Sequence, residues 1–347
     1  MPMGSDIGDL FTRRETELTE LRGQTVAIDA YNTIYQFLSS IRQRDGTPLK
    51  DSRGRVTSHL SGLLYRTTNL AHAGLKLVFV FDGTPPDFKA ETIEKRKEVR
   101  KTADMEWKKA LASGKTDEEA FTYAQATSRL DSTMVADAML LLESMGIPTV
   151  VAASEGEAQA AYMAGNGDVR FAGSQDYDSL LFGAPLVVRN LAVGGRRKLP
   201  KKNIYVEVKP EIIELQTDLD RLGITREQLI DIAILTGTDY DPGIRGIGAK
   251  KGLSLVRKGK TIEEILSELN ESIDGLSEIK EFFLHPDVAT DYPRPLRWGK
   301  PDESKVIALL CDEHDFSEAR VAKAIERLLA SSDAMGQSTL DMWSVRG

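Results

Sequence analysis

The segment KLVFVFD, residues 76–82, decides the fold because it places an apolar, strand-like run directly before an aspartate. TVAID at residues 25–29 repeats this pattern and ends on Asp29. Longer helical stretches separate such runs along the chain. This alternation predicts an α/β fold, in which a mostly parallel, twisted sheet carries helices on both faces.

Seven carboxylates lie at or near the ends of these runs. TVVA is followed by SEGEA, VRFAGS is followed by QDYD, and the helical run LTGTDYD carries one further acid. The carboxyl ends of parallel strands line one crevice, so acids far apart in the sequence converge there. Crowded carboxylates stay ionised only with cations among them, and oxygen ligands suit hard divalent ions. The pattern predicts a two-metal phosphodiester hydrolase with two Mg²⁺ ions, replaceable by Mn²⁺, at Asp29, Asp82, Glu155, Glu157, Asp176, Asp178 and Asp239.

Each of these acids also has a plain structural interpretation. SEGE is a capping-box pattern in which Ser154 caps a helix and Glu157 lies three residues further on. The acids of QDYD could be turn or cap residues, and Asp239 could open the turn before Pro242. Any single assignment is weak, so the prediction depends on their joint placement.

The composition describes a soluble globular protein. The chain has 347 residues, of which 41% are apolar and 28% are charged. No apolar run approaches the roughly 18 residues that span a bilayer, and the N-terminus lacks a signal-peptide pattern. The single cysteine, Cys311, rules out an intrachain disulfide and fits a reducing compartment. We therefore expect an intracellular protein that does not associate with membranes.

The chain divides into one large unit and a short tail. Helices are predicted at residues 57–73, 131–145, 155–164 and 225–237, and the first ends at Gly74. A long polar insertion at about residues 88–130 is predicted to be exposed helix, broken near residues 113–115, and to act as a lid or gate. We expect a nuclease domain at residues 1–330 and a flexible, small-residue tail at residues 331–347.

Basic residues gather in patches, although the net charge is −8. Residues 245–260 hold six basic side chains and no acidic one. Within this run, GIRGIGAKKG resembles a helix-hairpin-helix-type element, in which backbone amides and a helix N-terminus hold phosphate. A plain glycine turn between helices is the alternative. The acid-free run favours a DNA-binding element at about residues 225–260, with contacts from Arg245, Gly246, Gly248, Lys250 and Lys251.

Six motifs together resemble the flap endonucleases, the structure-specific 5′ nucleases of lagging-strand maturation and repair. They are VAIDAYNTIYQFL, TSHLSGLLYRT, FVFDGTPPDFKAETIEKR, SEGEAQAAYMA, SQDYDSLLFG and LTGTDYDPGIRGIGAKKG, and they span most of the chain in the expected order. The short C-terminus and the segment KDSRGR are similar to archaeal members. The resemblance implies that all seven carboxylates are metal ligands and that the insertion is a helical arch.

The resemblance also assigns roles beyond the carboxylates. Lys89 and Arg96 match a basic pair at the base of the arch that reaches the scissile phosphate. Tyr35 matches an aromatic residue that stacks on a base, and Arg42 matches a nearby basic contact. Without the family pattern, Tyr35 would be taken as a core aromatic and Arg42 as an exposed charge.

A further part of the resemblance concerns a pocket for a one-nucleotide 3′ flap. Thr57 and Arg66 fall in a segment that lines this pocket, and DFSEARV near residue 315 resembles another part of it. His314 and Asp315 depart from the Lys and Gln of eukaryotic members, which puts the 3′-flap preference in doubt.

The segment QSTLDMW resembles the box by which replication proteins dock on the sliding clamp. Gln337, Leu340 and Trp343 have the spacing of a short helical turn that carries an aromatic anchor. The usual second aromatic is replaced by Ser344, which predicts a weaker clamp contact. A disordered tail is the alternative.

The resemblance implies a monomeric, cytoplasmic, nucleoid-associated enzyme that cleaves branched DNA carrying a 5′ flap, near the junction of single and double strands. It also implies 5′–3′ exonuclease activity. Two other readings remain. The chain could be another 5′ nuclease of the same superfamily, acting on RNA or duplex ends, or a non-catalytic DNA scaffold bound to the clamp.

Overall fold

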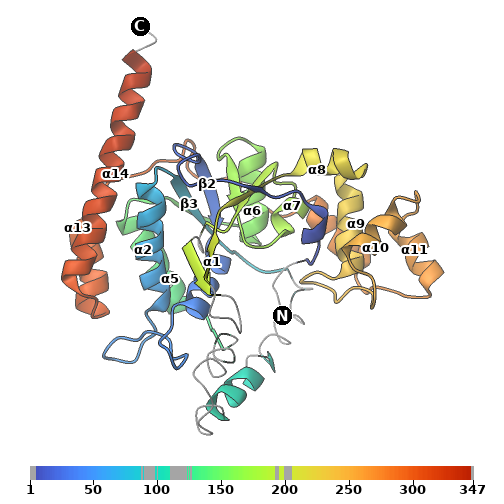
Figure 1. Cartoon of the computed structure of the whole chain (residues 1–347), viewed down its shortest axis with the longest axis horizontal. Helices are drawn as coiled ribbons and strands as arrows, with labels where there is room; N and C mark the ends of the chain where they lie inside the picture. The colour runs from blue at the N-terminus through green and yellow to red at the C-terminus, as the bar shows by residue number, and fades with distance from the viewer. Residues whose placement is uncertain are drawn as a thin grey trace.

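A sheet lies at the centre of the computed structural model (Figure 1). It has seven strands in the order β1-β9-β6-β5-β2-β3-β4. Neighbours from β6 to β4 are parallel, whereas β9 pairs antiparallel with β6 and β1. The predicted mostly parallel sheet is therefore confirmed. The strands are β1 Arg14–Glu15, β2 Thr25–Asp29, β3 Lys76–Phe81, β4 Thr149–Val151, β5 Phe171–Gly173, β6 Leu186–Arg189 and β9 Glu211–Glu214, and a separate antiparallel ribbon joins β7 Gly195–Lys198 to β8 Tyr205–Val208.

The structure describes residues 5–86, 89, 98–99, 101–109, 123, 125, 127–191, 195–198 and 205–344. Of residues 195–198, 205–207 and 332–344 it describes the backbone alone.

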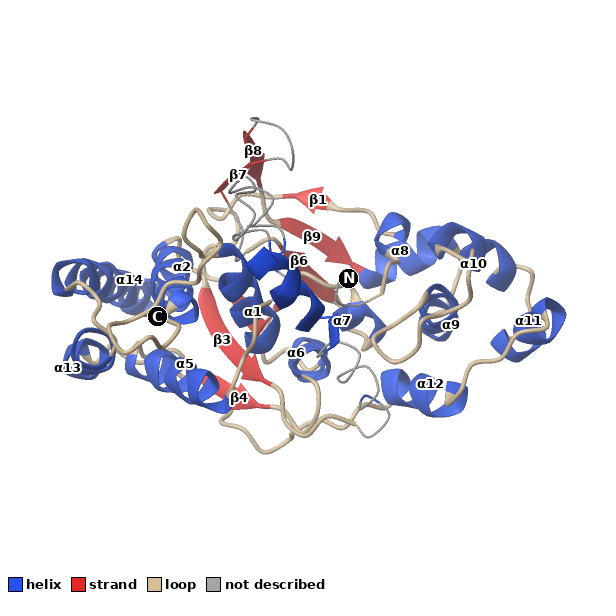
Figure 2. Cartoon of the chain, turned by 90° about the horizontal axis from the view of Figure 1, so that it is seen from below, coloured by secondary structure: helices blue, strands red, loops and turns tan. Residues whose placement is uncertain are grey.

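The strands are buried on both faces because helices cover each side of the sheet (Figure 2). Along β3, Leu77, Phe79 and Phe81 pack into one apolar cluster, whereas Val78 and Val80 pack into the other. The first cluster includes residues of α1 Ala30–Ser40, α2 Ser58–His72, α5 Ser132–Ser144, α13 Glu303–Ile307 and α14 Glu318–Ser344. The second includes residues of α6 Gly156–Gly165, α7 Asp178–Leu181, α8 Leu215–Leu222, α9 Arg226–Thr236, α10 Ala249–Val256, α11 Ile262–Leu269 and α12 Leu276–Leu284.

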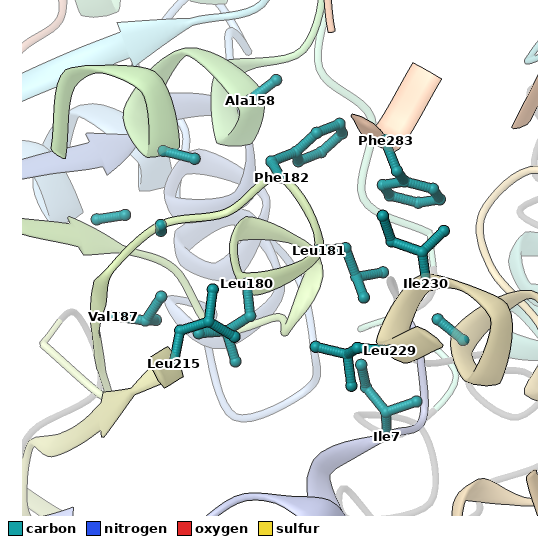
Figure 3. Close-up of a cluster of buried hydrophobic side chains, with 14 of the residues drawn as sticks. Ile7, Ala158, Leu180, Leu181, Phe182, Val187, Leu215, Leu229, Ile230 and Phe283 are labelled. Atoms are coloured by element: carbon teal, nitrogen blue, oxygen red, sulfur yellow. The ribbon is translucent and has the colours of Figure 1, made fainter. Parts of the chain in front are cut away.

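The second cluster joins the sheet to the helices that follow it in the sequence. Leu180 and Leu181 of α7 lie between Val187 of β6 and Leu229 of α9, as Figure 3 shows. Ile7, from the segment before the short 3₁₀ turn η1 Gly8–Leu10, packs into the same cluster. The N-terminal segment is thereby held against the loops that follow β5.

The helices predicted from the sequence are all present, with ends that differ by one residue. α2 stops at His72, and Gly74 adopts a φ of +95°, which suits a residue without a side chain. Residues 101–109 of the insertion are helical and project from the body (Figure 1). The predicted break at residues 113–115 lies outside the described residues.

The C-terminal helix α14 differs from the prediction. It continues through Ser344, where the sequence suggested a small-residue linker from residue 331. Its buried stripe, Val321, Ala324, Ile325, Leu328 and Ser331, ends where that linker was expected. From residue 332 to Ser344 the helix contains no proline and one glycine, Gly336, so nothing in this part forces it to stop.

Candidate active site

The carboxyl ends of the parallel strands bring the predicted acids together. Asp29 is the last residue of β2, and Asp82 follows β3 directly. β2 lies between β3 and β5 in the sheet. After β2 the chain adds β3 and β4 on one side of it, and then crosses over to add β5 and β6 on the other side. Such a reversal point is where open α/β sheets form their crevice. The remaining acids reach it from the start of α6, from the loop and helix after β5, and from the end of α9.

Electrostatic interactions connect all seven carboxylates. Asp29 feels the charges of Asp176 and Glu155, and Asp82 feels those of Asp29 and Glu155. Glu157 interacts with Asp178, Asp176 and Asp29. Asp239 acts on both Asp176 and Asp178. The predicted convergence is thus present in the structure.

Five of the acids, Asp29, Asp82, Glu157, Asp176 and Asp178, have raised pKa values because they are buried beside other carboxylates. Burial, followed by repulsion from Asp176 and Glu155, raises the pKa of Asp29 to about 7. Burial and the charges of Asp178 and Asp239 raise the pKa of Asp176 to about 7. Burial and Asp239 raise the pKa of Asp178 to about 6. Burial also raises the pKa values of Asp82 and Glu157 well above their ordinary range. The surrounding protein groups therefore do not fully compensate the negative charge that the cluster would carry if all its acids were ionised.

Lys89 contacts the cluster directly. Its Nζ donates to both carboxylate oxygens of Glu155 at 2.6 Å. Burial alone would lower the pKa of the Lys89 ammonium, but Glu155, Asp82 and Asp239 raise it. Lys89 also lies 5.8 Å from the centroid of the Tyr240 ring. A fixed positive charge therefore stands at the edge of the cluster, where the insertion begins.

The donor set fits hard divalent ions, because every candidate ligand is a carboxylate oxygen. Among the described residues, no three His, Cys, Asp or Glu side chains are arranged to share one ion. Lys89 donates to both oxygens of Glu155, and so would compete with a cation for that carboxylate.

The capping-box interpretation of SEGE is wrong. The N-cap of α6 is Glu155, and no side chain caps that helix end. The Ser154 hydroxyl is buried and has no hydrogen-bond partner among the residues described. Instead, the backbone N–H of Gly156 donates to Oδ1 of Asp82 at 2.8 Å, so the start of α6 receives a carboxylate from β3. The positive end of the α6 dipole therefore stabilises the negative charge of the Asp82 carboxylate.

The structure describes some, but not all, of the other residues that were predicted to contact the DNA strand to be cleaved. Tyr35 lies on α1, one turn after Tyr31, and is half-buried. Arg96 lies outside the described residues. Arg42 is engaged by the protein itself: its guanidinium donates to Leu38 O and Gly46 O at 2.8 Å and to Ser128 Oγ at 2.9 Å. Its DNA contact stays a prediction.

The turn that precedes Thr57 contacts the segment around residue 315, the second part assigned to the 3′-flap pocket. The backbone N–H of Ser52 donates to Asp315 Oδ2 at 2.6 Å, and Nδ1 of the buried His314 lies 3.2 Å from Asp51 Oδ2. Thr57 is the buried N-cap residue of α2. Arg66 is half-buried, and burial lowers its pKa. The 3′-flap pocket itself stays a prediction.

The GIRGIGAKKG segment connects α9 to α10 in a tight hairpin. A side chain at position 252 would place its Cβ 3.1 Å from Ile232 Cγ2, so glycine allows the two helices to pack closely. Gly246 has a φ of +82°, and Gly248 is the N-cap of α10. Lys250 and Lys251 are exposed, with Lys250 3.2 Å from Asp9. The amides and lysines are therefore accessible, as a phosphate contact requires.

Comparisons with known proteins agree with this geometry. A model of the XPG N-terminal domain matches residues 7–103, and a model of the XPG I-region matches residues 146–239. Flap endonuclease 1 of Methanococcoides burtonii is 58% identical over 341 residues, which cover 98% of this chain and all of that protein. The chain belongs to the flap endonuclease family. The resemblance inferred from the six motifs is thereby confirmed.

Solved structures of family members have the same fold. Flap endonuclease-1 from Methanococcus jannaschii superposes with a TM-score of 0.74 at 39% identity, covering 94% of this chain and 98% of that one. The catalytic core of Rad2 in complex with DNA substrate gives a TM-score of 0.66 at 25% identity, covering 93% and 97%. No helix in the described parts of this family member is long and apolar enough to cross a membrane.

Several residues that contact the acids were missed from the sequence. Asn32 donates its backbone N–H to Asp29 Oδ1 at 3.0 Å and its side-chain amide to Asp176. The Ser174 hydroxyl donates to Glu157 and accepts from the backbone N–H of Asp176 at 3.0 Å. The backbone N–H of Ser5 donates to Asp178 Oδ1 at 3.0 Å. In the sequence, Asn32 and Ser174 stand out only because each lies a few positions from an acid. Many residues that do not bind the cluster share this feature.

The raised pKa values predict how stability depends on pH once divalent ions are removed. In the unfolded chain these carboxyls ionise near pH 4, whereas in the folded protein several stay protonated up to about pH 7. The folded state therefore holds more protons between these values. The free energy of unfolding of the EDTA-treated protein should fall as the pH rises from about 5 to about 8.

Calorimetric melting across this range, with and without Mg²⁺, measures the effect. Mg²⁺ should reduce the decline, because it compensates the ionised cluster. Asp82→Asn, which removes one of the crowded charges, should also reduce it. A melting temperature that stays constant or rises with pH in EDTA would contradict the assignment of uncompensated charge to this cluster.

Proposed function

We propose that this flap endonuclease cleaves a DNA phosphodiester near the single-strand to double-strand junction of a 5′ flap, using the seven-carboxylate cluster and Lys89. The observation that carries the proposal is the convergence of seven acids from five separate chain segments, with Lys89 bound to one of them. Divalent ions held by these acids would supply the positive charge that in-line displacement at phosphorus requires.

The residues around the cluster have separate tasks in this proposal. Lys89 stabilises the negative charge that develops on the scissile phosphate. Arg96 adds a second positive charge from the arch. Tyr35 stacks on a base of the nucleotide that must unpair for its phosphate to reach the acids, which offsets part of the few kcal/mol that unstacking costs. Asp178 and Asp239 belong to the same acid cluster and would help to hold a second ion.

Substrate binding is assigned to surfaces on either side of the cluster. The hairpin between α9 and α10 holds duplex phosphates through Arg245, the amides of Gly246 and Gly248, and the two lysines, without reading sequence. Thr57 and Arg66, together with the segment around His314, receive the 3′ flap. The enzyme acts as a monomer, and its C-terminal motif docks on the sliding clamp.

Cleavage of a labelled double-flap substrate, with and without Mg²⁺, tests the proposal directly. Asp82→Ala and Asp176→Ala should nearly abolish single-turnover cleavage, because a missing oxygen ligand misplaces the charge that the transition state needs. DNA affinity should be retained or increased, since repulsion of phosphate falls. Retention of more than about a tenth of the wild-type rate, a barrier change below ~1.4 kcal/mol, would remove that residue from the ligand set. Equal cleavage of a blunt duplex would instead favour another nuclease of the superfamily.

The hairpin prediction concerns salt dependence. Replacing both Lys250 and Lys251 with Ala should weaken binding to duplex-containing substrates and leave the chemical step unchanged at saturation. If both lysines neutralise phosphates, the slope of log K against log salt should fall by up to ~2 units. The pair of Arg replacements preserves charge and should preserve the slope. An unaltered slope in the Ala variant would show that these lysines are only solvated.

The clamp prediction concerns residues 337–347, whose side chains lie outside the described part of the structure. Deleting them should leave unassisted cleavage unchanged and abolish stimulation by the clamp, because docking raises the local enzyme concentration on DNA. Trp343→Ala should act almost as strongly as the deletion, whereas Met342→Ala, outside the motif spacing, should not. Ser344→Phe should tighten binding by roughly 1–3 kcal/mol if the ring is buried. Calorimetric titration with the clamp from the same organism checks this, and equal affinity of the deletion and wild type would reject clamp docking.

A further inference from the structure

Arg189 ends β6, directly beside the loop that carries Asp176 and Asp178. Residues Gly173 of β5 and Val188 of β6 are register partners in the parallel sheet. One residue further along each strand, β5 enters the loop and β6 presents Arg189. The arginine therefore lies where the acid-bearing loop leaves the sheet.

The guanidinium of Arg189 binds the residues on both sides of Asp176. Its Nε and one terminal nitrogen donate to the carbonyl oxygen of Gln175 at 3.1 and 2.8 Å. Its other terminal nitrogen donates to the Tyr177 hydroxyl at 2.6 Å. The planar fork of arginine suits this arrangement, because its donors have fixed relative directions. The backbone before Asp176 and the side chain after it are thus attached to one rigid group.

Tyr177 is fixed from its other face as well. Its ring stacks on Phe11, with centroids 5.6 Å apart and planes inclined by 10°. The guanidinium carbon of Arg189 lies 4.2 Å from the centroid of the same ring. A Cβ at Gly8 would lie 2.5 Å from the Tyr177 hydroxyl, so the N-terminal segment closes tightly over this side chain. Tyr177 therefore has little freedom to move, and it separates the two acids of the loop.

We propose that Arg189 is a positioning residue of this enzyme, which holds the Gln175–Tyr177 backbone so that Asp176 and Asp178 face the other acids. The inference rests on the function proposed above, since it assigns to Arg189 the geometry of two metal ligands. Arg189 touches neither substrate nor ion in this role. Residues that orient ligands in this way typically change metal affinity by about 10-fold to 100-fold when replaced.

Two simpler roles make different predictions. If Arg189 only stabilises the fold, its replacement lowers the melting temperature and leaves the affinity for metal unchanged. If it only supplies positive charge near the acids, lysine replaces it fully. A positioning role requires the planar guanidinium. A lysine ammonium cannot donate to the Gln175 carbonyl and the Tyr177 hydroxyl in the same geometry.

The experiment measures Mn²⁺ binding to the full-length protein without DNA, by calorimetry. Arg189→Met should weaken Mn²⁺ binding by ~10-fold or more, and Arg189→Lys should fall between this variant and wild type. Tyr177→Phe keeps the ring stack and loses the hydroxyl, so it should weaken binding by roughly threefold to tenfold. In single-turnover cleavage, the Mn²⁺ concentration at half-maximal rate should rise in the same order, with the KM for DNA unchanged.

Arg294→Met is the matched control. Arg294 lies over the Tyr292 ring at 4.3 Å and 3.4 Å from Asp168, and it contacts none of the seven acids. Its replacement should leave Mn²⁺ affinity unchanged even if the melting temperature falls. Circular dichroism confirms that each variant is folded.

The outcomes separate this inference from the proposed function. Unchanged Mn²⁺ affinity in folded Arg189→Met, or full recovery in Arg189→Lys, would overturn the positioning role and leave the nuclease assignment intact. If Arg189→Met does not fold, unchanged affinity in both Arg189→Lys and Tyr177→Phe would overturn it. Wild-type protein that neither binds Mn²⁺ nor cleaves flaps would overturn the proposed function itself.

Discussion

Repulsion among buried carboxylates is the constraint on which the rest of the structure depends. Bringing seven acids to one edge of a sheet disfavours folding unless cations, protons or hydrogen-bond donors compensate their charge. The protein supplies such donors from every side: the start of α6, Asn32 of α1, Ser174 after β5 and the N-terminal segment. The two large apolar clusters on the faces of the sheet provide the burial that holds this unfavourable arrangement in place.

The same constraint explains why Lys89 lies where the insertion begins. An ammonium bound to Glu155 compensates one carboxylate, and it would also attract a phosphate that approached the cluster. The lysine is therefore both a stabilising partner and a candidate for the chemistry. Its position ties the beginning of the insertion to the acids.

The fold and the acids could be predicted because they depend on local patterns. Strand runs that end on Asp29 and Asp82 carry their own signal, and the topology of parallel strands places those ends together. The contacts of Ser154 and Arg42 could not be predicted in this way. Ser154 matched a capping pattern, but α6 takes its partner from Asp82. Arg42 matched a DNA contact, but its partners include Ser128, which is 86 residues away in the sequence.

The contact between Arg42 and Ser128 bears on how the length of the insertion can change. Lys89 fastens one end of the insertion to Glu155, and Ser128 fastens the other end to α1 and the turn after it. With both ends held by the body, the distance between them does not depend on the number of residues that connect them. The entropy of closing a loop grows only with the logarithm of its length. Changes in the length of the insertion therefore need not disturb the acids or the sheet.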